Sequence, residues 1–485
     1  MSWLNALTQI DDYRWELPQD YKPGMRVPAR IYADRRMIEQ LDEGDQAIEQ
    51  AANVAMLPGI VGRSLAMPDI HWGYGFPIGG VAAMRVEDGV VSPGGVGYDI
   101  NCGTRVITTT LGEHEMRPLV KALLDQLYRD VPPGMAGKGF LRLTTDELDE
   151  LMVQGSAWMV EHGYGEPEDL DATESRGCLP GADPSAVSER AHARGLAQLG
   201  TLGSGNHFLE FQVVDHIFDE EAAEAFGLIG LGQVVVFFHC GSRGLGHQVC
   251  TDYLKVMEGA IARYRIELPD VQLACAPVES AEGKAYLSAM AAAANFAWAN
   301  RQGITHQIRR AIMKVTGRSQ EELGLHLVYD VAHNMAKIER HRMNGKDVTV
   351  CVHRKGATRA FSAGHPEVPE RYRHVGQPVL VPGDMARYSY LAVGTEQAMT
   401  ETWGSTCHGA GRVRSRGAAK RLLEGVDVAA RMAAKGIVVR TQNPRALAEE
   451  ASEAYKDVAN VVDVLEHAGI SRKVARMRPI GVIKG

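Results

Sequence analysis

Clusters of glycine restrict the fold of this chain of 485 residues more than any other feature of its sequence. The chain has 52 glycines, and nine of them lie between Gly73 and Gly103, in WGYGFPIGGVAAMRVEDGVVSPGGVGYDINCG. Because glycine lacks Cβ, this stretch predicts short strands (VAAMRV, GVV) joined by tight turns that allow close approach of a ligand or another strand. Further glycine loops are expected at 200–205, 241–246 and 409–411. In three of these cases the loop adjoins a histidine or a cysteine.

Helical and strand-like patterns alternate between the glycine loops. Apolar residues spaced three and four apart predict helices at roughly 117–130, 143–161, 185–199, 280–315, 416–434 and 445–468. β-Branched and aromatic runs predict strands at 234–238, 325–332, 348–354 and 377–383. We therefore expect the α+β class, as a single large mixed α/β domain over residues 1–485 with central β-sheets flanked by helices. Residues 160–185, rich in Gly, Glu, Asp and Pro, are expected to form an exposed loop or an insertion.

Charge and cysteine usage exclude several classes of protein. The 52 basic and 60 acidic residues give a net charge of −8, which argues against a general nucleic-acid coat protein. Residues 401–485 hold 15 basic and 9 acidic residues, a local excess of +6 that suits an anion site. Seven cysteines without a CxxC pair indicate reduced thiols. With no signal-peptide pattern and no long apolar run, we expect a cytoplasmic protein that does not bind a membrane.

Histidine or cysteine follows several glycine-rich or strand-like segments. GGVGYDINCG places Asp99 three residues before Cys102, and VVVFFHCGSRGLG places His239 directly after a predicted strand. LVYDVAHNMAK repeats this arrangement with His333, and GSTCHGAGR places His408 among small residues. Each histidine alone is compatible with a structural role. Their recurrence predicts that imidazole and thiolate ligands converge on one or two divalent transition metals, Zn²⁺ or Mn²⁺, with the thiolate able to bridge two ions.

The segment GTLGSGNHFLEF has three open interpretations. In the first, His207 is structural and finds its hydrogen-bond partners locally. In the second, the backbone N–H groups of the glycine turn bind a phosphate. In the third, His207 is a metal ligand beside Asn206 and Glu210. A separate anion site is suggested by VHRKGATRAF, where basic residues surround one glycine, and by arginines in two glycine loops: Arg354, Lys355, Arg359, Arg243 and Arg412. The alternative for the basic turn is a solvated surface.

Motifs of common nucleotide enzymes are absent from the sequence. It has no GxxxxGK[ST] loop, no dinucleotide fingerprint, no GxSxG or HExxH motif, and no K-x-D-G motif of lysine-dependent nucleotidyltransferases. If a nucleotide is activated covalently, another nucleophile is needed, and His408 in its glycine setting is the candidate.

Eight segments in order resemble the RtcB family of RNA-splicing ligases: PDIHWGYGFPIGG, GGVGYDINCG, GTLGSGNHFLEF, HCGSRGLGHQ, YDVAHNMAK, VHRKGATRAF, GSTCHGAGR and RPIGVIKG. The resemblance runs from about residue 20 to the last residue. It implies an RtcB-like fold and a ligase that depends on GTP and Mn²⁺. Such an enzyme joins RNA ends bearing a 2′,3′-cyclic phosphate or 3′-phosphate to 5′-hydroxyl ends, in tRNA splicing or RNA repair. Its partners would be tRNA halves or cleaved RNA, and in some members archease.

The resemblance also implies roles for individual residues. His408 would be guanylylated, and Cys102 would bridge two Mn²⁺ ions, one completed by His239 and His333 and the other by Asp99 and His207. Glu210 and Lys484 would contact guanine, with help from Tyr455 and Ser389. Four residues fall where the family holds phosphate or RNA-end groups: Asn206, Arg243, Lys355 and Arg412.

One segment departs from the family pattern. Many members read PGSMGTxSY where this chain has PGDMARYSY, which introduces Asp384, Ala386 and Arg387. A carboxylate near a triphosphate repels it unless it is paired, and Arg387 is one candidate partner. Nucleotide affinity, nucleotide choice or full ligase activity is therefore the property that this change puts in question. Two other functions fit the same residues: a metal-dependent RNA-end phosphodiesterase without ligation, and a non-catalytic module that binds RNA ends.

Overall fold

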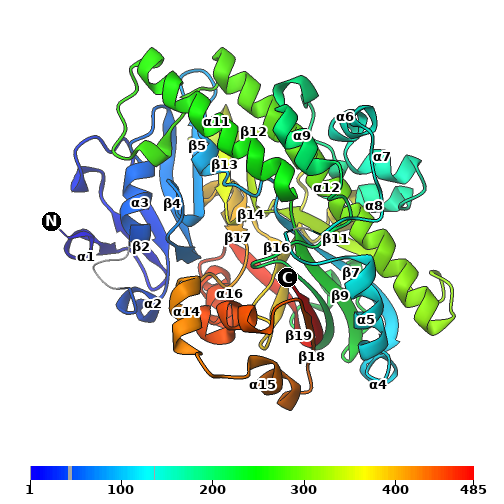
Figure 1. Ribbon diagram of the computed structural model, residues 1–485. Helices are drawn as coiled ribbons and strands as arrows, with labels where there is room; N and C mark the ends of the chain where they lie inside the picture. Colours follow the sequence, from blue (N-terminus) through cyan, green and yellow to red (C-terminus); the bar gives the residue numbers. More distant parts are fainter. Residues whose placement is uncertain (1, 42–45, 136) are drawn as a thin grey trace.

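Mixed β-sheets flanked by helices make up the structure, a computed structural model that describes residues 2–41, 46–135 and 137–485 (Figure 1). In Figure 1, one large sheet lies to the left, on the side of the N-terminus, and the other lies to the right. This arrangement confirms the predicted α+β class with central sheets flanked by helices. The limits of a single domain over residues 1–485 stay a prediction.

The first sheet is antiparallel except for one parallel pair, β3 with β4. Its strands run in the order β1 (Thr8–Gln9), β2 (Arg14–Leu17), β3 (Ala29–Tyr32), β4 (Ile60–His71), β5 (Ile78–Arg85), β13 (Lys346–Lys355) and β12 (Asn334–Met343). The predicted strands VAAMRV and 348–354 correspond to β5 and β13. The strand β4 ends at His71, so the segment that follows it leads directly toward the site described below.

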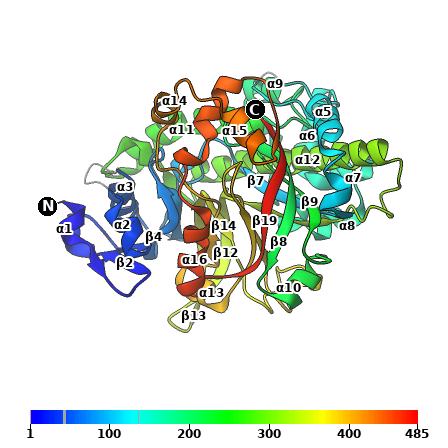
Figure 2. The same cartoon turned by 90° about the horizontal axis from the view of Figure 1, so that it is seen from below.

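The second sheet holds most of the predicted site residues at its strand ends. Its order is β11 (Leu327–Ala332), β7 (Gly103–Gly112), β9 (Gln233–Cys240), β8 (Phe208–Ile217), β19 (Ser471–Lys484), β16 (Ser389–Gly394) and β15 (Pro378–Val381). All pairs along this order are antiparallel, and β18 (Val438–Thr441) adds a parallel pairing to the end of β19. Figure 2 shows β19 and β8 as long neighbouring strands.

Pairs of short strands also form outside the two large sheets. In one pair β6 (Val90–Val91) runs antiparallel to β10 (Ala276–Pro277). In the other, β14 (Ala357–Arg359) runs antiparallel to β17 (Ser405–Cys407). The second pair places the end of β17, and hence His408, beside the turn that follows β13.

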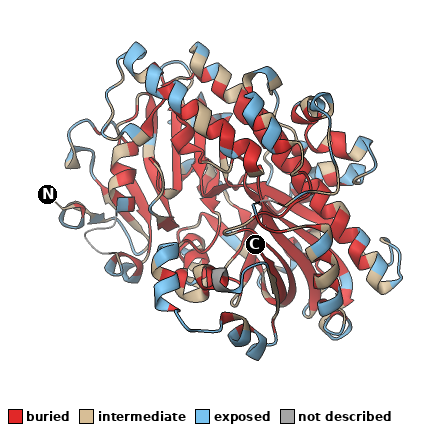
Figure 3. Cartoon of the chain, in the orientation of Figure 1, coloured by how far each residue is buried: buried red, intermediate tan, exposed pale blue. Residues whose placement is uncertain are grey.

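Helices cover the sheets, and their buried faces point inward (Figure 3). The first half of the chain contributes α1 (Trp3–Ala6), α2 (Arg35–Glu39), α3 (Gln46–Val54), α4 (Glu113–Met116), α5 (Val120–Asp130), α6 (Thr145–Gln154), α7 (Ser156–Glu161), α8 (Pro167–Asp171), α9 (Glu189–Gly195) and α10 (Glu220–Ala225). The second half contributes α11 (Arg243–Tyr264), α12 (Ala281–Thr316), α13 (Glu396–Glu401), α14 (Arg416–Leu422), α15 (Val428–Ala434) and α16 (Val458–His467). Among the described residues, no helix is long and apolar enough to cross a membrane.

The long helix α12 forms where the Ala-rich pattern predicts it. Its first turn is capped by Ser280, whose hydroxyl accepts from the Gly283 N–H at 3.0 Å, and it ends at Gly317 in the left-handed conformation (φ +71°). Most of its middle is buried, because it packs against α11 on one side and α5, α6 and α7 on others. This buried position brings polar residues of α12 beneath the second sheet.

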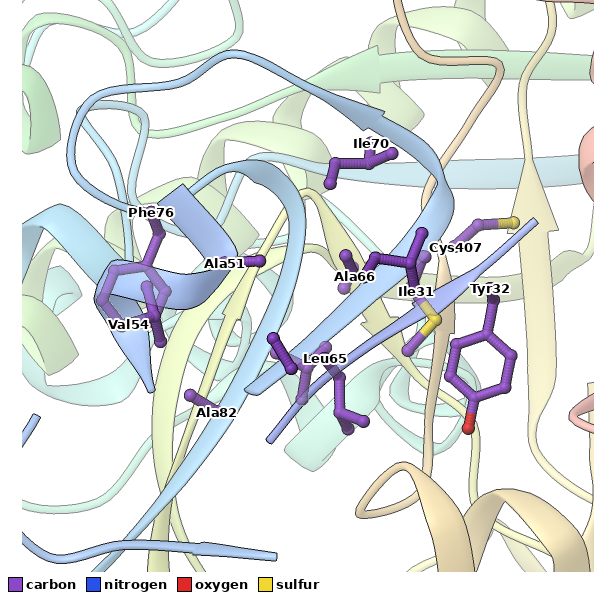
Figure 4. Close-up of a cluster of buried hydrophobic side chains, with 14 of the residues drawn as sticks. Ile31, Tyr32, Ala51, Val54, Leu65, Ala66, Ile70, Phe76, Ala82 and Cys407 are labelled. Atoms are coloured by element: carbon purple, nitrogen blue, oxygen red, sulfur yellow. The ribbon is translucent and has the colours of Figure 1, made fainter. Parts of the chain in front are cut away.

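A hydrophobic cluster fixes the start of the loop after β17, which carries His408. Ala51 and Val54 of α3 pack toward Leu65, Ala66 and other strand residues of the first sheet (Figure 4). The same cluster includes Cys407, which precedes His408 and is buried. Burial of this side chain anchors the loop that carries the candidate nucleophile.

Four expectations about local structure are wrong. The single helices expected at 143–161 and 416–434 are each two helices, α6 with α7 and α14 with α15, because Gly155 and Gly425, both at positive φ, interrupt them. The glycine loop expected at 241–246 is instead largely the first turn of α11, which begins at Arg243. Its glycines serve packing, because a Cβ on Gly244 would lie 2.8 Å from Arg194 Nε and one on Gly246 would lie 1.9 Å from Ser242 Oγ. The helix expected at 445–468 is α16 alone, preceded by short 3₁₀ turns, since Asp457 caps a new start by accepting from the Ala459 N–H.

The segment 160–185 combines exposed and buried residues. It contains α8 and a 3₁₀ turn. Buried residues in its middle form ion pairs with the core, Asp169 with Arg309 and Glu174 with Lys337. Its status as an insertion stays a prediction.

Candidate active site and metal centre

Antiparallel strand order gathers the predicted metal ligands at one end of the second sheet. Cys102 directly precedes β7, and His207 directly precedes β8. His239 lies near the end of β9, and His333 follows β11. Since β7 is antiparallel to β9 and β11, and β8 to β9, the starts of β7 and β8 meet the ends of β9 and β11. Asp99 joins them from the glycine-rich turn before β7.

The first group of ligand atoms consists of Cys102, His239 and His333. The Cys102 Sγ lies 3.0 Å from His239 Nε2, which lies 2.8 Å from His333 Nε2. All three side chains are buried. Their donor atoms lie within 4.8 Å of one another, close enough to hold one cation together.

The second group consists of Asp99, Cys102 and His207. His207 Nε2 lies 2.9 Å from Asp99 Oδ2 and 3.3 Å from Cys102 Sγ. Because Cys102 belongs to both groups, its sulfur stands between them. A thiolate in this position can contribute to both groups at once.

Protonation states favour metal binding at His239 and His333. At His207 a cation must displace a proton, because the thiols of Cys102 and Cys240 and the hydrogen bonds to Asp99 and Cys102 outweigh burial and hold the pKa of His207 well above its usual range. Burial holds the pKa of His239 and of His333 well below the usual range, so both imidazoles are neutral and carry a lone pair. Burial would raise the pKa of Asp99, but the hydrogen bond and charge of His207 outweigh it and keep the carboxyl ionised. Burial and the charge of Asp99 raise the pKa of the Cys102 thiol to about 12. A cation that binds Cys102 must therefore displace a proton.

The surrounding contacts orient the ligands inward. His207 Nδ1 is 2.8 Å from the Leu202 carbonyl oxygen, so its Nε2 is the nitrogen left for a cation. Asp99 Oδ1 accepts from the Ser242 N–H at 2.9 Å, and Asn334 donates to the Asp99 carbonyl oxygen at 3.0 Å. A buried set of thiol, imidazole and carboxylate donors held in this way fits a divalent transition ion such as Mn²⁺ or Zn²⁺.

A cavity of about 990 Å³ opens beside the first group. His239 and His333 line it, together with His408 from the loop after β17. Of the other predicted site residues, it is lined by Asn206, Glu210, Arg412, Tyr455 and Lys484. Asp99, Cys102, His207 and Ser389 are not among the lining residues, but Cys102 contacts the lining residue His239, and Ser389 is joined to Glu210 through Gln212. The structure thus brings most of the predicted residues into one site.

His408 is held by a carboxylate that sequence reasoning missed. Asp69 Oδ2 lies 2.5 Å from His408 Nδ1 and also accepts from the His408 backbone N–H at 3.1 Å. An ionised carboxylate only accepts, so Nδ1 carries the proton and Nε2 presents its lone pair. The His408 ring lies 4.7 Å, centroid to centroid, from that of His333. Gly356 (φ +61°) permits this placement, because a Cβ there would lie 3.1 Å from His408 Cε1.

Glu210 and Lys484 line the same cavity and come from the neighbouring strands β8 and β19. Glu210 pairs with Val482 in the β8–β19 register, so Lys484 is two residues farther along β19. Burial raises the pKa of Glu210 to about 7, despite the nearby Lys484 charge. Gln212 links Glu210 to Ser389, donating to the two side chains at 2.6 and 3.0 Å. These polar groups can read the edge of a base.

Glu450 is a second residue that sequence reasoning missed. This buried carboxylate accepts from Arg412 Nη1 at 3.2 Å and from the Tyr455 hydroxyl, and it lies 3.5 Å from Lys484 Nζ. It therefore joins three of the predicted site residues in one network. Because it stands in an ordinary run of acidic residues, ALAEEASEA, no local signal marked it.

Two predicted anion-binding residues lie outside the cavity lining. Arg243 donates from Nε to Thr201 Oγ1 at 3.0 Å and from Nη2 to the Gly134 carbonyl oxygen at 2.9 Å. Lys355 donates to the carbonyl oxygens of Tyr74 and Phe76 at 2.5 and 3.2 Å, and burial lowers its pKa to about 7. Their binding of phosphate or RNA stays a prediction.

The basic turn after β13 is not a solvated surface. Arg354 and Arg359 are buried and paired with Glu339 and Glu367, each at 2.6 Å. The expectation that these two arginines form an anion site is wrong, because their charges are already neutralised within the core.

Asp384 lines the cavity and is paired. Its Oδ2 lies 3.2 Å from Arg387 Nε, and its Oδ1 accepts from the Ser452 hydroxyl at 2.5 Å and the Ala386 N–H at 3.0 Å. Burial raises its pKa above the usual range. Arg387 thus supplies the partner that the departure from the family pattern requires.

Exposed aromatic and basic side chains also line the cavity. Trp72 is 66% exposed there, although large aromatic side chains are normally buried. Arg414 and Arg416 line the same cavity. An exposed ring beside positive charge suits a nucleobase and its phosphates.

Comparisons with known proteins agree over the whole chain. A family model described as tRNA-splicing ligase RtcB matches residues 50–485. A protein of Archaeoglobus fulgidus named tRNA-splicing ligase RtcB is 58% identical over 485 residues, which is all of both chains. Proteins of the same name are 55% identical over all of both chains in Thermococcus kodakarensis, and 54% identical in Aeropyrum pernix, over 98% of this chain and 99% of that protein.

Proposed function

This chain belongs to the RtcB family of tRNA-splicing ligases, and on that premise we propose that it is an RNA ligase that uses GTP and Mn²⁺. It joins a 2′,3′-cyclic phosphate or 3′-phosphate end to a 5′-hydroxyl end through a guanylylated His408. One observation carries the proposal: His408, oriented by Asp69, lines the same cavity as His239, His333, Glu210 and Lys484.

His408 is the nucleophile in this proposal. Its Nε2 lone pair attacks the α-phosphorus of GTP, the bond to pyrophosphate breaks, and a P–N bond to GMP forms. Asp69 keeps the proton on Nδ1 and offsets the positive charge that the ring gains during attack. An oxygen of the RNA 3′-phosphate then displaces His408 and takes GMP, after water has opened any cyclic phosphate. Finally the 5′-hydroxyl attacks the 3′-phosphate, and GMP leaves.

Two Mn²⁺ ions, held by Cys102 with His239 and His333 and by Cys102 with Asp99 and His207, would supply positive charge against the reacting phosphates. The neutral state of His239 and His333 supports this assignment, since a protonated imidazole cannot be a ligand.

Guanine is recognised at the Glu210 end of the cavity. The Glu210 carboxylate accepts from the N–H groups of the guanine edge, and Lys484 donates to its carbonyl oxygen. Glu450 holds Lys484, Tyr455 and Arg412 in place. Asn206, which lines the cavity beside His207, faces the phosphates.

The RNA ends contact the lining residues Trp72, Arg412, Arg414 and Arg416, of which Trp72, Arg414 and Arg416 are exposed. Because the net charge of the chain is −8, its affinity for RNA comes from the positive charge of these arginines and from the bound cations. The substrates are tRNA halves or cleaved RNA, and activation by archease stays a prediction.

Incubation with α-labelled GTP and Mn²⁺ tests the proposal. Label should remain on the denatured chain and disappear in His408→Ala, while His114→Ala, which changes an exposed histidine elsewhere, should keep it. Hydrolysis of a cyclic phosphate without covalent label would instead establish a metal-dependent phosphodiesterase. RNA binding with neither activity would establish a non-catalytic module.

A further inference from the structure

A buried arginine on α12 lies beneath the metal-ligand groups. Arg301 is fully buried, and each of its N–H-bearing nitrogens makes hydrogen bonds. Nη1 donates to the carbonyl oxygens of Asn101 and Cys240 at 2.7 and 3.0 Å, and Nη2 donates to Asn101 Oδ1 at 2.9 Å. Nε and Nη2 donate to the two carboxylate oxygens of Asp330 at 2.6 and 2.8 Å.

These acceptors belong to the three segments that carry the first ligand group. Asn101 directly precedes Cys102, and Cys240 directly follows His239. Asp330 lies on β11, the strand that leads to His333. One guanidinium therefore contacts the residues next to Cys102 and His239 and, through Asp330, the strand that leads three residues on to His333.

The second group is fixed by other contacts. Asp99 is held by the N–H and hydroxyl of Ser242 at 2.9 and 3.2 Å, and His207 by the Leu202 carbonyl oxygen at 2.8 Å. Cys102 alone is common to both groups. A change at Arg301 should therefore affect one group more than the other.

The chemistry of arginine suits this task. Its guanidinium is planar and permanently charged, so it holds several acceptors at fixed angles, which a lysine ammonium cannot do. Asn101 adopts a left-handed backbone (φ +50°), and two of the Arg301 hydrogen bonds hold that residue. The turn that positions Cys102 is thus held to the core at Asn101, the residue whose backbone conformation is unfavourable.

We propose that Arg301 is a positioning residue that sets the spacing of the Cys102, His239 and His333 cation site. It acts through the peptide groups beside the ligands and touches neither a cation nor substrate. The proposal rests on the proposed function only for the premise that these groups bind divalent cations.

Arg105 provides a matched control. It is also fully buried and donates from Nε to Asp330 Oδ2 at 2.5 Å. Its other contacts are to side chains of Gln302, Thr305 and Thr173, so it shares the carboxylate but none of the carbonyls beside the ligands. Arg105→Lys and Arg301→Lys remove the same kind of group from the same ionic cluster.

Calorimetric titration of the metal-free full-length chain with Mn²⁺ tests the proposal. Arg301→Lys should weaken one of two cation sites by roughly 10- to 100-fold, the range for changes to residues that support metal ligands, and weaken the other site, which shares only Cys102, by less. Arg105→Lys should keep both affinities, although its thermal unfolding midpoint falls by a similar amount. Equal affinities in the two variants would overturn the proposal and leave Arg301 a core ion pair.

A second variant and the titration of the wild-type chain separate a failure of the positioning role from a failure of folding or of metal binding. If Arg301→Lys does not fold, Asn101→Gly, which suits the left-handed backbone and deletes one Arg301 acceptor, should weaken the same site, and unchanged affinity would reject the idea. A wild-type chain that binds no Mn²⁺ would refute the metal part of the proposed function as well. Normal wild-type binding with unaffected Arg301 and Asn101 variants would refute the positioning role alone.

Discussion

Replacing Asp69 with asparagine should slow guanylylation of His408 far more than it affects GTP binding. Asp69 Oδ2 accepts from both the ring and the backbone N–H of His408, at 2.5 and 3.1 Å, and Asp69 is fully buried. The amide of asparagine is neutral, and it can present an N–H to Nδ1. That contact would favour the tautomer with the proton on Nε2, the nitrogen that must attack.

The size of the effect follows from the hydrogen bond that is lost. A hydrogen bond to a charged group contributes about 1.5–3 kcal/mol, and since each 1.36 kcal/mol changes a rate tenfold, labelling should slow by roughly 10- to 150-fold. The apparent KM for GTP should change little, because Asp69 is fully buried and is not among the residues that line the cavity. Single-turnover labelling with α-labelled GTP at several GTP concentrations separates the two quantities.

Asp384→Asn is the matched control, because Asp384 is another buried carboxylate that borders the cavity but contacts Arg387 and Ser452. It should change KM and leave the maximal labelling rate near that of the wild type. Metal content and thermal unfolding are measured for both variants. A maximal rate for Asp69→Asn equal to that of the wild type, with normal metal content, would refute the role of Asp69 in orienting His408.

Three further predictions concern the cations and the nucleotide. Cys102→Ala removes the donor that both ligand groups share, so metal analysis should find loss of bound Mn²⁺ and covalent labelling should cease; near-normal labelling with both ions bound would contradict a bridging role. Glu210 has a pKa of about 7 and must be ionised to accept from guanine, so GTP affinity should rise as pH increases through about 7, and Glu210→Gln should bind GTP more weakly at high pH and lose this dependence; a parallel pH profile in the variant would exclude Glu210 as its source. Asp384→Ser should lower the apparent KM for GTP by removing a carboxylate near the triphosphate, whereas Arg387→Ala, which leaves that carboxylate unpaired, should raise it; unchanged values in both would dismiss an effect of this pair on nucleotide binding.

Residues next to strand ends and glycine turns could be found from the sequence. His239 and His333 follow β-rich runs, and Asp99, Cys102 and His207 adjoin glycine turns. Strand ends and tight turns are encoded locally, in periodicity and in the missing Cβ, so the sequence predicts where such side chains stand along the chain. It does not predict which strands become neighbours.

Glycine alone was ambiguous. Around residues 241–246 it predicts a loop, but in the structure it lets the first turn of α11 approach Arg194 and Ser242. Both outcomes need a residue without Cβ, and only the packing partners distinguish them.

By itself the sequence determined the α+β class, the positions of the main strands and the long helix, and a set of histidine, cysteine and acidic residues able to bind metal. The tertiary structure alone decided the partners of those residues. Asp69 and His408 are separated by 339 residues, and Arg301 and Asn101 by 200, so neither pair leaves a pattern in a local window. Such contacts arise because buried polar groups must find hydrogen-bond partners wherever the packed strands and helices bring them, and that requirement is met only in the folded chain.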